Sequence, residues 1–247
     1  MITGNRELNS DWKSDVRIIG EGDSAGGLFR KISIMGQGRI DGDASCETFR
    51  CMGDASVQGQ LTASSFKQLG NMHIKGGLSG DSASTLGELR VDGSLQVRRM
   101  KLIGAMKVGQ NLRGEKLKCS GQLQLHGDCI SEEVRIRGVI TAEGAVNAER
   151  IQIKLNGPSH VREIGGAQID VQQASLSWFP ILRSKRVSKT LTADLIEGDN
   201  IRLEHVEAKV VRGRHVTIGP GCRIGLVEYK EKYKEHHSAK VGESVRH

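Results

Sequence analysis

Aromatic residues and proline are scarce in this sequence. Of its 247 residues only 3% are aromatic and three are proline, against 32 glycines. The shortage of aromatic side chains argues against a bulky globular core, which normally depends on Phe, Tyr and Trp. So much glycine with so little proline is also unlike a disordered linker protein. We therefore expect a core that is built from small aliphatic side chains.

Long hydrophobic runs are missing as well. No apolar segment approaches the length that spans a bilayer, and residues 1–15 are polar, unlike a signal peptide. Both absences favour a soluble, cytoplasmic protein. The formal net charge of +7 permits an anionic partner but does not require one.

Cysteine is present, but in no recognisable motif. The five cysteines form neither a CxxC pair nor a metal-ligand spacing, and an odd number without an export signal indicates reduced thiols. They are Cys46, Cys51, Cys119, Cys129 and Cys222. The first four occupy inward positions of the repeat described below, which favours small buried hydrophobes over metal or redox chemistry.

An internal repeat dominates the sequence. Glycine recurs every 17 residues, at Gly36, Gly53, Gly70, Gly87, Gly104, Gly121 and Gly138. In most units a second glycine follows six residues later. A fixed period of this length is typical of a solenoid.

Each 17-residue unit contains three pairs of mostly apolar positions, with the two members of a pair two residues apart. This spacing places both side chains on one side of a β-strand. Glycine suits the corners because it accepts positive φ without strain. Three short strands per unit predict an all-β fold, a parallel β-helix with triangular coils. The usual hand of parallel crossovers favours a right-handed helix.

The repeat also predicts how the chain is organised. We expect one rod in five segments: a flexible N-terminal arm (1–15), a β-helix (16–157), an irregular lip (158–192), C-terminal β-helix coils (193–229) and a charged flexible tail (230–247). The lip begins where the register breaks at Asn156-Gly157-Pro158.

Coils with glycine corners, such as residues 34–43 (IMGQGRIDGD), resemble the bactofilins, a family of bacterial polymer-forming cytoskeletal proteins. Residues 196–199 (IEGD), 209–213 (KVVRG) and 216–222 (VTIGPGC) are similar to a longer Gram-positive branch. The resemblance covers about residues 16–229. It implies a right-handed β-helix that polymerises end to end without nucleotide. It also implies filaments that often lie on the cytoplasmic membrane and support cell shape or motility.

The ends of a β-helix give a physical reason for polymerisation. Each end has unpaired backbone groups and an uncovered apolar cross-section, which must be capped or extended. We expect the two end layers to comprise Phe29, Ile32 and Ile34, and Val216, Ile218, Cys222, Ile224 and Tyr229. The partner would be a second copy or a paralogous bactofilin. Alternatively, residues 1–15 and 230–247 cap the ends, and the rod is a monomeric or small-oligomer binding scaffold.

Outward positions of the repeat carry a basic stripe, composed of Arg50, Lys67, Lys101, Lys118 and Arg135. Stacked like charges repel one another, so such a stripe needs a reason. A neighbouring column of acids would form a solubilising ion-pair surface with it. Alternatively, the stripe faces an anionic membrane or a protein partner.

The predicted lip contains a segment with the composition of an interfacial membrane anchor. It comprises Trp178, Phe179, Ile181, Leu182, Arg183, Lys185 and Arg186. Such a segment would place the protein peripherally on the inner face of the cell membrane. The alternative is an apolar loop that packs against the flank of the rod.

No pattern in the sequence predicts an enzyme. Histidines show no metal-ligand pair, and neither a Ser-His-acid set nor a phosphate-binding GxxxxGK[ST] loop is visible. With only eight aromatic residues there is no stacking platform for nucleic acid. We expect a structural protein without catalytic residues, cofactor, metal, small-molecule substrate or nucleic-acid partner.

Overall fold

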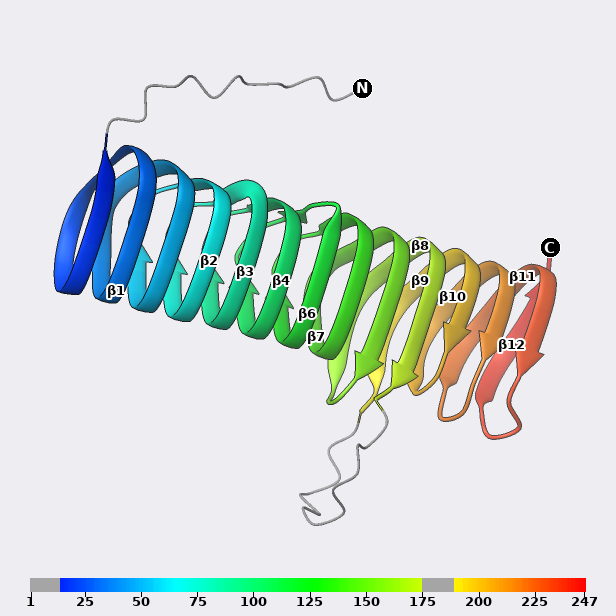
Figure 1. Ribbon diagram of the computed structural model, residues 1–247. Helices are drawn as coiled ribbons and strands as arrows, with labels where there is room; N and C mark the ends of the chain where they lie inside the picture. The colour runs from blue at the N-terminus through cyan, green and yellow to red at the C-terminus, as the bar shows by residue number, and fades with distance from the viewer. Residues whose placement is uncertain (1–13, 175–188) are drawn as a thin grey trace, which may run out of the picture.

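The computed structural model describes residues 14–174 and 189–247, and the regular structure within them is β-strand alone. Figure 1 shows the chain winding as stacked coils along one rod, with β1 at one end and β12 at the other. The predicted fold class is confirmed, and the solenoid has about 11 turns. The strands are β1 (Asp15–Val57), β2 (Leu61–Ile74), β3 (Leu78–Val91), β4 (Leu95–Val108), β5 (Leu112–Arg113), β6 (Lys116–Leu125), β7 (Cys129–Leu155), β8 (Ser159–Gln173), β9 (Leu191–Leu203), β10 (Val206–Ile218), β11 (Arg223–Glu235) and β12 (Lys240–Arg246).

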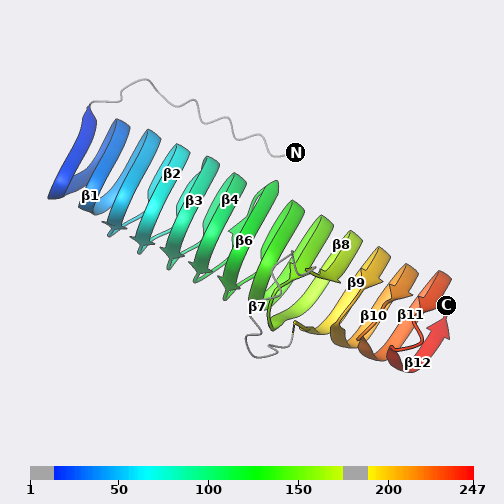
Figure 2. The ribbon, with the colours of Figure 1, turned by 60° about the horizontal axis from the view of Figure 1, so that its bottom comes forward.

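Residues 17 positions apart pair in parallel along the N-terminal half of the rod. Phe49 pairs with Phe66 and Gly53 with Gly70, so equivalent positions of successive units form columns. The same step continues through β3, β4 and β6 to β7. Figure 2 shows these coils side by side along the rod.

One of these columns consists of glycines and forms a corner of the rod. From Gly36 to Gly138 their φ angles lie between 118° and 149°, which side chains other than glycine rarely adopt. Space is also lacking, because a Cβ on Gly70 would lie 2.2 Å from the carbonyl oxygen of Gly53. The repeating glycine therefore reflects both the turn and the close contact between coils.

Inward side chains fill the rod with one continuous apolar cluster. It extends from Ile18 in the first coil to Val227 near the other end. Most members are Ile, Leu, Val and Ala, as expected from the composition. Phe49 and Phe66 stack on adjacent coils, with ring centroids 5.3 Å apart. The two rings thus occupy equivalent core positions of successive coils.

Two polar side chains, Gln68 and Thr85, interrupt this core on adjacent coils. The Gln68 side-chain amide donates to the carbonyl oxygens of Gly70 and Glu88. Its Oε1 and the Thr85 hydroxyl have no hydrogen-bond partner among the described residues. An unpaired polar atom in a core costs desolvation free energy that no hydrogen bond returns.

Replacing Thr85 with valine is therefore expected to raise the free energy of unfolding by about 1–2 kcal/mol. Valine keeps the shape of threonine and removes the unpaired hydroxyl. Chemical denaturation followed by circular dichroism measures the change. The matched control is Thr62→Val, because the Thr62 hydroxyl is exposed and bonds the Ser79 hydroxyl at 3.0 Å. A stability gain in the control, or none in Thr85→Val, would contradict the interpretation.

The prediction of an irregular lip from residue 158 is wrong for residues 159–173. They form β8, which pairs with β7 on one side and β9 on the other. The repeat was hidden because its step changes: Ile151 pairs with Ile169, and Ile169 pairs with Ile201. A buried serine, Ser159, replaces an apolar residue there, and its hydroxyl accepts a hydrogen bond from the Ile140 backbone amide.

The predicted flexible tail, 230–247, is also wrong in its secondary structure. β11 extends to Glu235, and β12 adds a further parallel strand to the rod. Polar and charged residues together occupy most positions, but Tyr233 and Val241 face inward and pack against the core. Of the predicted N-terminal arm, residues 1–13 lie outside the described part, and Asp15 already begins β1.

Candidate functional site

The predicted N-terminal end layer lies mostly one coil inside the rod. Ile32 and Ile34 are at most 1% exposed, because the coil that contains Val16 and Ile18 covers them. Phe29 belongs to that first coil and is 9% exposed. The outermost apolar layer among the described residues therefore consists of Val16, Ile18 and Phe29.

The predicted C-terminal end layer is covered in the same way. Its buried members are Val216, Ile218, Cys222 and Ile224. Tyr229 is partly buried and stacks on Tyr233, with ring centroids 5.2 Å apart. With Ala239 and Val241, these tyrosines form the apolar layer at this end. The prediction included Tyr229 but missed Tyr233, Ala239 and Val241, because it treated residues 230–247 as a tail.

Both ends present strand edges. Within residues 14–174 and 189–247, no strand pairs with the outer edge of the first coil or of β12. An exposed edge has free backbone donors and acceptors that a further strand can pair with. Each end thus combines hydrogen-bonding capacity with an apolar layer.

The predicted basic stripe forms a single outward column. Arg50 pairs with Lys67, Lys101 with Lys118, and Lys118 with Arg135, while Ser84 occupies the gap. All five basic side chains are exposed. Among the described residues only Arg135 has a carboxylate partner, Glu133. The alternative of a mutually neutralising ion-pair surface therefore fails for the other four cations.

The predicted membrane lip cannot be placed, because all seven of its residues, Trp178 to Arg186, lie outside the described part of the chain. In the part that is described, no helix has the length and hydrophobicity needed to span a bilayer.

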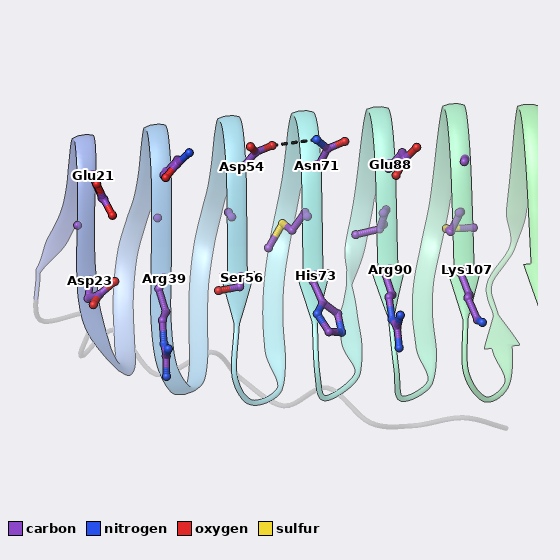
Figure 3. Close-up of a pocket in the computed structure, with 18 of the residues that line it drawn as sticks. Glu21, Asp23, Arg39, Asp54, Ser56, Asn71, His73, Glu88, Arg90 and Lys107 are labelled. Carbon is purple, nitrogen blue, oxygen red and sulfur yellow. Dashed lines mark hydrogen bonds between the residues drawn. The ribbon is translucent and has the colours of Figure 1, made fainter.

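A shallow groove of about 730 Å³ follows the other side of the glycine corner. The labelled side chains in Figure 3 form two rows along the groove, and successive coils supply successive residues of each row. One row includes Glu21, Asp54 and Glu88, and the other includes Arg90 and Lys107. Sequence reasoning did not single out this groove, although its residues recur at fixed positions of the 17-residue unit.

Two residues that line the groove, His73 and Arg90, both bind the carboxylate of Asp92, which lies beside it. The carboxylate accepts hydrogen bonds from His73 Nε2 at 2.7 Å and Arg90 Nε at 2.8 Å. Burial alone would raise the pKa of Asp92, but these two hydrogen bonds outweigh burial and lower the pKa. The carboxylate is therefore ionised and held by two donors at neutral pH.

Ser56 pairs with His73 on the neighbouring coil, which places a serine, a histidine and an aspartate close together. The Ser56 hydroxyl, however, bonds the Gln58 side-chain amide at 3.4 Å, and it makes no hydrogen bond to His73. A nucleophilic serine needs its base within hydrogen-bond reach. The three side chains therefore do not form a hydrogen-bonded Ser-His-Asp chain in this structure.

All five cysteines are buried. Burial raises the pKa of the Cys119 and Cys129 thiols to about 12, so both remain protonated at neutral pH. Among the described residues, no three His, Cys, Asp or Glu side chains gather as a metal site.

A second column, which sequence reasoning missed, consists of exposed aliphatic side chains. It comprises Ile19, Met35, Met52, Leu69, Leu86 and Ile103. Each of these residues immediately precedes a glycine of the corner. The signal was available in the repeat, at the one outward position that is apolar in six successive units.

Comparison with known proteins gives relatives but no function. No protein-family model matches the sequence, and no solved structure matches it. The chain is 51% identical over 74 residues to the uncharacterized protein YhbF of Bacillus subtilis, which is 30% of this chain and 29% of YhbF. It is 40% identical over 102 residues to the uncharacterized protein YhbE of the same organism, which is 40% of this chain and 41% of YhbE. The matches thus span less than half of either relative.

Proposed function

We propose that this protein is a structural scaffold whose rods assemble end to end without bound nucleotide. The observation that carries the proposal is the pair of apolar end coils with unpaired strand edges. A further copy would extend the parallel ladder and cover Val16 at one end or Val241 at the other. The resemblance of the glycine-cornered coils to bactofilins supports the same proposal and suggests a cytoskeletal role in cell shape or motility.

The proposal predicts that a charge at either end disrupts assembly. In Val16→Asp and Val241→Asp, a carboxylate in the end layer would have to be buried without a partner. We expect at least a tenfold loss of sedimentable polymer, and of filaments in electron micrographs, for each variant. Sedimentation and microscopy of the unchanged protein in the absence of nucleotide also test whether assembly is independent of nucleotide.

Val139→Asp is the matched control, because Val139 is also partly exposed but lies in the middle of the rod. It should assemble as the unchanged protein does. The size of the residual species also reports filament polarity. Head-to-tail assembly leaves monomers in either variant, whereas head-to-head assembly leaves dimers joined through the intact end. If both end variants polymerised normally, the proposed interface would be wrong.

The second candidate function is a binding scaffold that works as a monomer or small oligomer. The groove in Figure 3 favours it, because it presents fixed rows of charged and polar side chains over several coils. Unchanged protein that stays monomeric at the highest concentration reached would favour this function over assembly.

A further inference from the structure

One side of the rod combines apolar and cationic columns. It consists of the residues one, three and five positions before each corner glycine, from Gly20 to Gly138. We call this surface the pre-glycine face. Residues two apart on a strand point to the same side, so the three columns lie next to one another.

The column next to the glycines is the aliphatic one. From Ile19 to Ile103 its side chains are between 44% and 63% exposed. They include six of the eight large hydrophobic side chains that are exposed among the described residues. Because adjacent strands are about 4.8 Å apart, the column is about 24 Å long. A continuous exposed apolar surface is uncommon and marks an interaction site.

Of the other two columns, the one three positions before each glycine is strongly cationic, while the one five positions before contains three cations and two acids. Their basic residues, with Arg137 at the end of the first column, are Arg17, Lys31, Arg50, Lys67, Arg99, Lys101, Lys116, Lys118, Arg135 and Arg137. The face has two acids, and both are paired: Asp15 with Arg30 at 2.7 Å, and Glu133 with Arg135. Apart from Arg135, none of these cations has an ion-pair partner among the described residues. Their charge is therefore available to an external anion.

Where the aliphatic column ends, the face has a depression of about 320 Å³. Lys118, Arg135, Arg137 and Lys154 line it, and no acid does. A small anionic group fits the chemistry of such a depression. Cations, of which Arg135 alone has an ion-pair partner among the described residues, thus continue directly from the apolar column.

We propose that the pre-glycine face binds the surface of an anionic lipid bilayer. The aliphatic side chains would enter the boundary between headgroups and acyl chains, while the adjacent cations contact the headgroups. This proposal concerns a single rod and does not depend on end-to-end assembly.

Other occupants fit the face less well. A second copy stacked face to face would oppose cationic columns with cationic columns. Nucleic acid would match the charge, but the face has no aromatic side chain for base stacking and leaves the aliphatic column unused. Glu21, Asp54 and Glu88 immediately follow corner glycines and line the groove on the neighbouring side (Figure 3), so these acids do not belong to the pre-glycine face.

Vesicle flotation tests the proposal, because assembled rods alone would sediment rather than float. The full chain is mixed with vesicles of equal parts phosphatidylcholine and phosphatidylserine, or of phosphatidylcholine alone. We expect flotation only with the anionic vesicles. The double variants Leu69→Ser/Leu86→Ser and Lys67→Gln/Lys101→Gln should each reduce the bound fraction at least tenfold.

Matched controls are available on other sides of the rod. Among the described residues, Leu28 and Ile130 are the two exposed large hydrophobics outside the column, and Leu28→Ser/Ile130→Ser should float normally. Lys75→Gln/Lys107→Gln removes two cations outside the face and should also float normally. Absence of flotation by the unchanged protein, or equal losses in the controls, would overturn the proposal.

Two further measurements separate the other occupants. Duplex DNA binding that depends on Lys67 and Lys101, without flotation on anionic vesicles, would assign the face to nucleic acid. In Leu69→Cys, the new thiol is the exposed one among the described residues, since the native cysteines are buried. A disulfide-linked dimer formed rapidly without lipid would assign the face to a second copy. Either result would overturn the lipid proposal.

Discussion

Replacing Gly70 with alanine is expected to lower the free energy of unfolding by roughly 3–5 kcal/mol. Gly70 has a φ of 120°, so a side chain at this position strains the backbone. The new Cβ would also lie 2.2 Å from the Gly53 carbonyl oxygen, which is backbone and cannot rotate away. Relief requires that two coils separate, which weakens the hydrogen bonds between them. Thermal unfolding followed by circular dichroism measures the change.

Gly42→Ala separates the two contributions. Gly42 also has a positive φ, of 100°, but a Cβ there would meet no atom within 4 Å. It should therefore show only the backbone strain, about 1–3 kcal/mol, and unfold at a temperature between the unchanged protein and Gly70→Ala. Equal effects of the two substitutions would mean that the close contact between coils does not determine the glycine column.

The N-terminal half could be predicted in detail because its step stays at 17 residues from Gly36 to Gly138. Each 17-residue unit repeats the same alternation of inward and outward residues, so the columns follow from the sequence alone. The basic stripe is an example: Arg50, Lys67 and Lys101 belong to one column in the structure, as the spacing predicts. Because the units are in strict register, the inward and outward positions found in one unit predict those in the others.

The C-terminal half could not be predicted this way, because each coil has its own length. Ile151 pairs with Ile169, which is 18 residues away, and Leu191 pairs with Val206, which is only 15 away. A coil can be shortened at a corner without disturbing the inward strands. The corner at His205 shows this, since His205 is the one non-glycine residue with positive φ in the described part of the chain. After one such change in coil length, a fixed 17-residue period no longer aligns equivalent positions of successive coils.

The end layers were misplaced for a related reason. Whether a coil is the last one depends on whether its neighbours pair with it, and composition gives little indication of pairing. β12 has the polar composition of a tail, yet it pairs with β11 along its backbone, and its Val241 side chain packs against the core. The aliphatic column carries no charge, so the charge pattern of the outward positions did not indicate it. The structure shows that the side chains of Leu69 and Leu86 are 45% and 49% exposed, and this exposure makes them candidates for an interaction surface.

The second large effect is expected for Phe66→Ala, with a loss of roughly 3–5 kcal/mol in the free energy of unfolding. Phe66 is 1% exposed and lies between Phe49 and Ala83 in its column. Two alanines in succession would leave a cavity beside Phe49 that the rigid coils cannot close. Phe66→Leu keeps most of the volume and should cost less than half as much.

A double-mutant cycle isolates the stacking of the two rings. Phe49→Ala, Phe66→Ala and the double variant should show a coupling of about 0.5–1.5 kcal/mol, because the rings are 5.3 Å apart at an interplanar angle of 12°. Each coil contacts mainly its neighbours, so the loss of stability should also be local. Hydrogen exchange of backbone amides in β1, β2 and β3 should accelerate in Phe66→Ala, while exchange in β9 and β10 stays nearly unchanged. Uniform acceleration along the whole rod would instead indicate that the solenoid unfolds as one cooperative unit.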